Sequence, residues 1–413
     1  MFLGRTGQTE VNLVTGRFAL QYAGAGSLDS RFDFSQPSVL MRLDIARVFG
    51  TGLTFSMYGR TYYDLSDQYP RYGEGSRLKL RMYEFSLSYD DDRAWYGYTL
   101  GRVTSRFVGG LGVFDGGQVF IRRNNVAVGL LLGTQADYRT SGIDGDQQKV
   151  AAFVNCSWGG EVFRQSDITF AYGQQLYQGK LDRDFLYLQT SARFGSEVSL
   201  YQSSEIDLHK ISAGTRSGAL RVTNTFVTLS YSPVSWLNST GGYDATRNVY
   251  LFESMKSIPD TLLDKKLQQG YRAGATVRLP YNVALFGTAN FRLKRGTTRS
   301  ARTLGGGVRV SDIARTQLNA GVQYSSIMGV YTEGNDVTVD VDCWMSTVMS
   351  LSLRIDRYAY TLLTQSDRLV TTTAGANVNY RISRSWYCVF NIDQVWDSTR
   401  NSQRIYFELG VHF

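Results

Sequence analysis

The sequence predicts an all-β fold: a single transmembrane antiparallel β-barrel of about 22 strands, with roughly 20 to 24 strands compatible. Three observations support this prediction. The last ten residues, Arg404 to Phe413, alternate between polar and apolar without a fault. Alternating segments of about ten residues, the length of a tilted membrane strand, recur along the chain. The connections between these segments alternate between short and long, as the turns of such barrels do.

The final segment places five apolar residues on one face, because side chains of a strand alternate with period two. It resembles the closing strand of Gram-negative outer-membrane β-barrels, in which a terminal Phe and alternate aromatic or aliphatic residues serve as the assembly signal. The resemblance implies an integral protein of a bacterial outer membrane, with outer-membrane lipids and the barrel assembly machinery as partners. By the same resemblance, the assembly signal comprises Tyr406, Phe407, Leu409, Val411 and Phe413.

Composition agrees with a membrane barrel and argues against other classes. Tyr (27), Phe (22) and Gly (42) are abundant and Pro (5) is scarce. No apolar run reaches about 18 residues, so no transmembrane helix is predicted. The net charge of +8 raises nucleic acid as a partner. The basic residues are scattered through alternating segments without forming a patch, so no nucleic-acid binding is expected.

Cysteine and histidine supply no recognisable site. Cys156, Cys343 and Cys388 form no CxxC pair, and an odd number cannot pair fully. We interpret them as small hydrophobic residues that face lipid. His209 and His412 lie far apart in sequence and outside any metal-ligand spacing. No metal and no cofactor are therefore expected.

Counting back from a periplasmic C-terminus, short periplasmic turns should alternate with long extracellular loops. Pro280–Asn282 is very short, and the preceding connection, Phe252–Gln269, is the longest of all. One pair departs from the rule: Gln178–Arg183, counted as extracellular, is shorter than Trp158–Ser166, counted as periplasmic. The even strand number predicts that both termini are periplasmic.

The predicted domain organisation is simple. Residues 1–413 form one outer-membrane barrel domain, residues 1–9 form a short periplasmic N-terminal segment, and no plug domain is expected in this chain. Two segments break phase, one between Met82 and Phe85 and one between Val222 and Val227. A β-bulge, or a strand that continues beyond the bilayer, would explain each.

Two glycine-rich stretches require interpretation. Gly109–Gly117 contains no GxxxxGK[ST] motif and precedes no helix, so it does not indicate a phosphate-binding loop. We interpret it as an extracellular loop that folds into the lumen. Gly305–Gly307 lies in the middle of a strand, where it indicates tight curvature or a bulge.

Enzymatic chemistry has one candidate cluster. His209, Glu205 and Asp207 are predicted to share an inward face near the extracellular end of a strand, where they could act as acid and base. The alternative is a polar lumen wall, which is the rule in such barrels and which we favour. A surface-exposed enzyme is therefore the third hypothesis, and no catalytic residue is assigned.

Charge placement is the most informative functional feature. A basic set lies inward on the segments from Tyr271 to Val310, and a largely acidic set lies inward on later segments. Rows of fixed charge in a water-filled pore set ion selectivity, so this pattern predicts a channel with weak anion preference. The alternative is that charge pairs brace a wide barrel. The predicted pore-lining residues are Arg272, Arg278, Arg292, Lys294, Arg309, Asp340, Asp342, Arg354 and Asp356.

The first functional hypothesis is a porin-like channel for passive diffusion of small hydrophilic solutes. Barrels of about 16–18 strands already leave an aqueous channel, and 22-stranded transporters carry a plug, so an empty barrel of this width would leak. The connection Phe252–Gln269 is the largest candidate for a gate or constriction. The alternative hypothesis is a structural sheath, or an export or electron-transfer conduit, that houses a lumen-filling partner protein.

Overall fold

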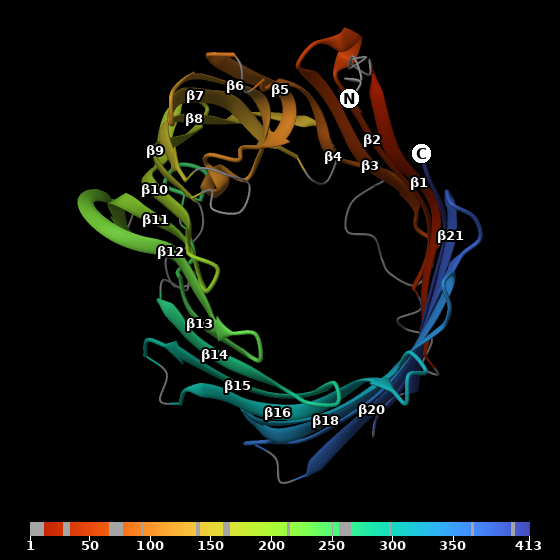
Figure 1. Cartoon of the computed structure of the whole chain (residues 1–413). Helices are drawn as coiled ribbons and strands as arrows, with labels where there is room; N and C mark the ends of the chain where they lie inside the picture. The colour runs from red at the N-terminus through yellow and green to blue at the C-terminus, as the bar shows by residue number, and fades with distance from the viewer. Residues whose placement is uncertain are drawn as a thin grey trace.

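The described residues form one closed antiparallel sheet of 22 strands (Figure 1). This confirms the predicted all-β barrel and its strand number. The structure, a computed structural model, describes residues 12–27, 34–65, 77–91, 94–137, 141–159, 166–212, 215–249, 251–255, 266–296, 299–364, 367–397 and 401–413. The predicted N-terminal segment 1–9 lies outside them. Among the described residues, no helix is both long and apolar enough to cross a membrane.

The strands follow one another around the barrel in chain order. The first half of the sheet consists of β1 (Leu13–Ser27), β2 (Phe34–Ala46), β3 (Leu53–Tyr63), β4 (Leu78–Tyr89), β5 (Tyr96–Thr104), β6 (Val113–Arg123), β7 (Val126–Ala136), β8 (Ile143–Trp158), β9 (Ser166–Tyr177), β10 (Lys180–Phe194) and β11 (Val198–Ser212). Two short 3-10 helices, η1 (Val48–Gly50) and η2 (Gly109–Leu111), lie in connections of this half.

The second half of the sheet completes the ring. It consists of β12 (Thr215–Val234), β13 (Leu237–Thr246), β14 (Gln268–Leu279), β15 (Val283–Lys294), β16 (Ala301–Ile313), β17 (Leu318–Met328), β18 (Thr332–Ser346), β19 (Met349–Leu362), β20 (Arg368–Arg381), β21 (Trp386–Asp397) and β22 (Asn401–His412).

The barrel closes between its first and last strands. β1 pairs with β2 on one side and with β22 on the other, with Leu20 opposite Leu409 in the closing ladder. Gly16 N donates to the carbonyl of Phe413 at 2.8 Å, so the pairing continues to the last residue. The start of β1 and the end of β22 therefore lie at the rim that carries the short turns. That this rim faces the periplasm stays a prediction.

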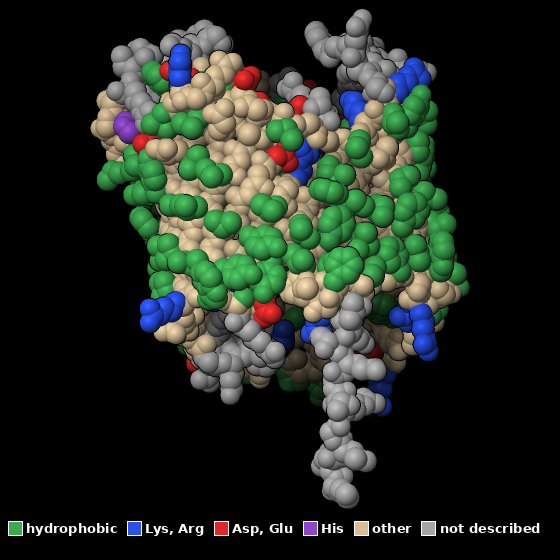
Figure 2. All heavy atoms as spheres, turned by 90° about the horizontal axis from the view of Figure 1, so that it is seen from above, with side chains coloured by type: hydrophobic (Ala, Val, Ile, Leu, Met, Phe, Trp, Pro, Cys, Tyr) green, Lys and Arg blue, Asp and Glu red, His purple; other side chains and the backbone are tan. Residues whose placement is uncertain are grey.

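An apolar belt crosses the side of the outer wall that Figure 2 shows, and large apolar residues are exposed on strands around the barrel. On β7 the outward residues Leu130 and Leu132 are 56% and 60% exposed. Exposure of large apolar side chains over a whole wall is unfavourable in water, but favourable against hydrocarbon. Each cysteine pairs in register with outward apolar residues, Cys156 with Val126 for example. A closed barrel with this belt is an integral membrane protein.

The two breaks of phase are β-bulges, which was one of the two predicted explanations. In the β3–β4 ladder Tyr58 pairs with Glu84 but Gly59 pairs with Met82, which leaves Tyr83 as the extra residue. In the β11–β12 ladder the extra residue is Thr223. Each bulge returns the following apolar residues to the outer face.

Of the two explanations predicted for Gly305–Gly307, the bulge is wrong, and tight curvature stays a prediction. The β15–β16 register runs through these glycines without a shift. Gly305 and Gly307 are required because neighbouring side chains lie over them: a Cβ on Gly307 would meet the Phe286 ring at 2.5 Å, and one on Gly305 would meet Ser325 Oγ at 2.7 Å. The predicted exception to the alternation of turn lengths is confirmed. Only Gln178 and Gly179 join β9 to β10, so this connection is shorter than the one between Trp158 of β8 and Ser166 of β9.

Candidate functional site: an inward segment and a charged lumen wall

A segment of the chain folds into the barrel between β5 and β6. β5 ends early, at Thr104, and residues 105–112, here called the inward segment, turn inside the ring of strands and carry η2 (Figure 1). The predicted inward folding of the glycine-rich stretch is confirmed for Gly109–Gly112, whereas Val113–Gly117, also predicted as loop, belong to β6. Within the segment Phe107, Val108 and Leu111 are buried.

The inward segment is buried because the inner wall beneath it is apolar. On β6 to β9, outward residues such as Val119, Leu130 and Phe170 are exposed, whereas inward residues such as Phe120, Leu131 and Ala171 are buried. Phe107 stacks on Phe153 with ring centroids 4.4 Å apart and meets Phe120 edge to face at 5.3 Å. The remaining wall residues of this cluster are Phe114, Ala127, Leu131, Ala151, Ala171, Phe185 and Tyr187. Where the inward segment covers them, these strands are therefore apolar on both faces.

A buried lysine ties the inward segment to the wall. Lys149 of β8 is 4% exposed. Its Nζ donates to the carbonyl of Leu111 and, at 3.1 Å, to the carbonyl of Val113. A buried ammonium is tolerated only when its hydrogen-bonding capacity is met. Lys149 thus binds the carbonyls of Leu111 and Val113, where the inward segment leads into β6.

A local motif begins the turn of the inward segment. Ser105 Oγ accepts from the backbone N–H groups of Phe107 and Val108 at 3.2 and 3.1 Å, and donates to Gln118 Oε1 at 2.5 Å. A serine that bonds the backbone ahead of it favours a turn over a continuing strand. The turn then passes close to β11, where a Cβ on Gly110 would meet Glu205 Oε1 at 2.9 Å.

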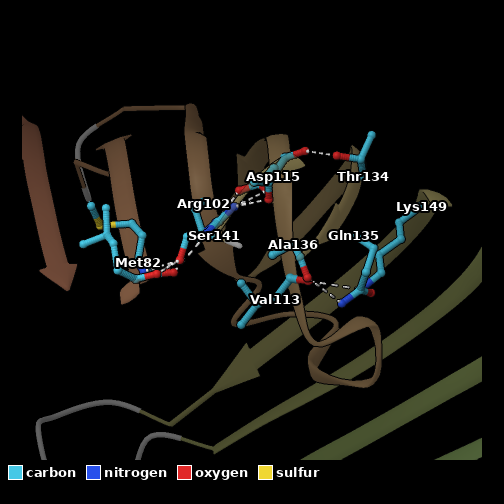
Figure 3. A network of polar contacts seen from close by, with 11 residues as sticks. Met82, Arg102, Val113, Asp115, Thr134, Gln135, Ala136, Ser141 and Lys149 are labelled. Atoms are coloured by element: carbon cyan, nitrogen blue, oxygen red, sulfur yellow. Dashed lines mark hydrogen bonds and ion pairs between the residues drawn. The ribbon is translucent and has the colours of Figure 1, made fainter. Parts of the chain in front are cut away.

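Arg102 links β4 and β5 beyond the point where their backbone pairing ends. The β4–β5 ladder ends at the pair Phe85 and Arg102. Arg102 grips Asp115 with Nε at 2.6 Å and Nη2 at 2.7 Å (Figure 3). It also donates to the carbonyls of Met82 at 3.0 Å and Gly142 at 2.8 Å. One side chain therefore joins β4, β5, β6 and the β7–β8 connection.

The predicted acid–base cluster does not assemble. Arg183 lies between Glu205 and Asp207, with Nη2 at 2.8 Å from a carboxylate oxygen of each. A register shift follows Asp207, and His209 Nδ1 lies instead 2.6 Å from Asp184 Oδ1. An arginine thus pairs with the two carboxylates, and the histidine pairs with Asp184, which favours the polar-wall interpretation.

The described part of the longest connection docks on β10. Asp182 Oδ1 accepts from Glu253 N at 2.6 Å, and its Oδ2 accepts from Ser254 Oγ at 2.8 Å. Phe252 N donates to the Asp182 carbonyl at 3.1 Å. Residues 256–265 of the predicted gate lie outside the described residues, so its role stays a prediction.

The opposite half of the barrel carries the predicted charged residues on the face opposite the apolar belt. Arg309 Nη2 lies 2.6 Å from Asp340 Oδ2, and Arg354 Nε lies 2.6 Å from Asp356 Oδ2. The side chains of Arg309 and Arg354 are 49% and 63% exposed. Arg272 lies 3.7 Å from Asp244.

Glycines let aspartates of this wall reach across a strand. Asp340 lies in register with Gly321, which lies in register with Arg309, so the ion pair spans the intervening strand β17. A Cβ on Gly321 would meet Asp340 Oδ1 at 2.7 Å. Gly270 has the same relation to Asp244, at 2.5 Å. Alternation alone did not reveal these rows, because they depend on register across three strands.

The remaining predicted residues lie in different cross-strand rows of the wall. Arg292 follows Asp244 and Gly270 in the same cross-strand row. Arg278 pairs in register with Ala284, and Asp342 with Asn319. Lys294, opposite Gln268, ends β15. The effect of these residues on permeation stays a prediction.

A carboxylate with four donors locks the closing seam. Glu408 of β22 accepts from Arg17 Nη2 and from the hydroxyl of Tyr387 on one oxygen. Its other oxygen accepts from Gln21 Nε2 at 3.0 Å and from Tyr406 at 2.5 Å. The Glu408 side chain is only 4% exposed. Tyr406, which the resemblance assigned to the assembly signal, thus contacts the inner network. Its recognition by an assembly machine stays a prediction.

Comparison with known proteins shows the fold class. No protein-family model and no curated protein matches the chain. Among solved structures, the siderophore receptor PirA from Acinetobacter baumannii is 8% identical with a TM-score of 0.53, over 98% of this chain and 81% of that one. A double mutant of the ferric enterobactin receptor PfeA from Pseudomonas aeruginosa is 9% identical with a TM-score of 0.57, over 96% and 80%. The fold is that of outer-membrane β-barrels.

Proposed function

We propose that this protein is a channel through which small hydrophilic solutes cross the outer membrane by passive diffusion. The observation that carries the proposal is the inward segment, packed on one half of the inner wall while the other half keeps charged side chains accessible to water. A wide barrel would leak if nothing narrowed it. Here a buried segment of the chain narrows the lumen, and the charged half lines the remaining path.

Unlocking the inward segment should change conductance. We expect Lys149→Met to raise mean single-channel conductance, or to add rapid current fluctuations, because the carbonyls of Leu111 and Val113 lose their buried donor. The measurement is single-channel recording of the purified chain in a planar bilayer.

Lys180→Met is the matched control, since Lys180 is exposed at the start of β10. It should conduct as the unaltered protein does. Equal conductance of all three proteins would contradict a constriction held by Lys149. A folded, heat-modifiable barrel that never conducts would contradict the channel itself.

Selectivity provides a second prediction for the channel. Replacing Arg272, Arg278 and Arg292 with glutamine should shift the reversal potential in a salt gradient toward cations, because these arginines dominate the basic side of the lumen. Arg309 is left in place, since it lies 2.6 Å from Asp340, whereas Arg272 lies 3.7 Å from Asp244. An unchanged reversal potential would leave these arginines as braces of the wall and remove the proposed weak anion preference.

A second candidate function follows from the strand number. Outer-membrane transporters of 22 strands hold a plug in the lumen, so a sheath or conduit around a partner protein is the alternative. The charged half of the inner wall would then contact the partner. Co-purification of a stoichiometric partner together with absent conductance would favour this candidate over the channel.

A further inference from the structure

Trp344 is an exposed tryptophan on the inner face of the barrel, where contact with the membrane cannot account for it. Aromatic residues of barrels gather at the two membrane interfaces, on the lipid side. Trp344 instead lies in register with Ser350, on the inner face that also carries Asp342. It is 55% exposed, and its indole makes no ring contact or hydrogen bond among the described residues. The other tryptophans lie in turns or on the outer face: Trp95, Trp158, Trp236, Trp386 and Trp396.

A trough lies beside Trp344 on the inner wall. Across β18, β19 and β20, Trp344 is in register with Ser350 and then Asn379. The neighbouring row consists of Asp342, Ser352 and Asn377. The small side chains of Ser350 and Ser352 on β19 form the bottom of the trough, and the larger side chains on β18 and β20 form its sides. The hollow measures about 520 Å3, within the range of small-molecule sites.

The polar groups of the trough are planar and already oriented. Asn379 Nδ2 donates to Asn377 Oδ1 at 2.6 Å, and Arg381 Nη2 donates to the Thr347 carbonyl at 2.7 Å. Asp342 and Arg381 contribute one charge of each sign, so the trough carries no net charge from this pair. A neutral ligand with several hydroxyl groups matches this balance better than an anion or a cation does.

We propose that this trough, the mouth subsite, binds a neutral carbohydrate whose pyranose ring packs on the indole of Trp344. A pyranose has a face of C–H groups that suits an exposed aromatic ring, and an edge of hydroxyl groups that suits amide, carboxylate and serine partners. Ser350, Ser352 and Asn379 would take the hydroxyl edge. The inference rests on the proposed channel only where it names the class of solute that the channel would carry. Binding of a carbohydrate at the subsite does not require the barrel to conduct.

The test uses maltotriose and the detergent-solubilised full chain. Saturation-transfer NMR detects weak binding directly, and its dose dependence provides the affinity. We expect saturable transfer to maltotriose and none to a polyethylene glycol of similar mass. Trp344→Phe should weaken binding by about tenfold because a smaller ring remains, and Trp344→Ala should abolish it. Trp386→Ala, on the outer face nearby, should leave binding unchanged.

The outcomes separate the subsite from the channel. Binding that is lost in Trp344→Ala and kept in Trp386→Ala supports the mouth subsite even if the barrel does not conduct, which would overturn the channel alone. Conductance without maltotriose binding overturns the subsite and leaves the channel standing. Equal binding by the two alanine variants, both shown to be folded by heat-modifiability, overturns the role of Trp344.

Discussion

Replacing Glu408 with alanine should lower the free energy of unfolding by about 3 kcal/mol. The carboxylate accepts from Arg17, Gln21, Tyr387 and Tyr406, on three strands around the closing seam. Its removal leaves all four donors without their acceptor. The cost stays near the lower end for a buried charge because the Arg17 side chain is 37% exposed. Urea-induced unfolding in lipid vesicles, followed by tryptophan fluorescence, measures the change.

Glu333→Ala is the matched control for Glu408. Glu333 pairs with Arg299, but its side chain is 48% exposed, so its loss should cost about 0–1 kcal/mol. Glu408→Gln, which keeps the shape but presents an N–H to donor groups, should lie between the two. Equal midpoints for the two alanine variants would show that the seam does not depend on this carboxylate.

Arg102→Ala should cost about 3–5 kcal/mol, because it leaves the Asp115 carboxylate nearly buried without its cation. The side chains of Arg102 and Asp115 are 7% and 11% exposed. The β4 edge around Met82 also loses a donor that the short β4–β5 ladder cannot replace. We expect a lower urea midpoint, together with faster hydrogen exchange at Met82, whose N–H bonds Ser141 Oγ.

Two variants discriminate a buried clamp from a general loss of charge. Arg102→Lys keeps the positive charge but cannot grip a carboxylate with two nitrogens, so it should recover only part of the lost stability. Arg309→Ala removes an arginine that is 49% exposed in its ion pair and should cost about 0–1 kcal/mol. Similar losses for Arg102→Ala and Arg309→Ala would contradict the assigned clamp.

Sequence reasoning located the strands well because the signal is local. Alternation of period two needs only neighbours in the chain, and it placed 22 strands, the closing strand and both phase breaks. It failed where one pattern has two explanations. Gly305–Gly307 predicted either tight curvature or a bulge; the unshifted register excludes the bulge, and the Phe286 ring over Gly307 reveals close packing that the sequence did not suggest.

The inward segment left a signal that the sequence reasoning did not use. Residues Val126 to Leu132 of β7 are almost continuously apolar, so their inner face requires a cover. That pattern predicts a buried inner wall, but not what buries it. The cover comes from a segment before β6, held by Lys149, and such a pairing is invisible to periodicity.

By itself, then, the sequence determined the barrel, its approximate strand number, the outward and inward faces, and which connections are short. These follow from alternation and turn length, which are properties of neighbouring residues. Only the tertiary structure decided which inward groups meet: Arg183 with Glu205 and Asp207, Asp340 with Arg309 across Gly321, and Glu408 with four donors. The reason is physical, because these contacts depend on register between strands and on a chain turned into the lumen.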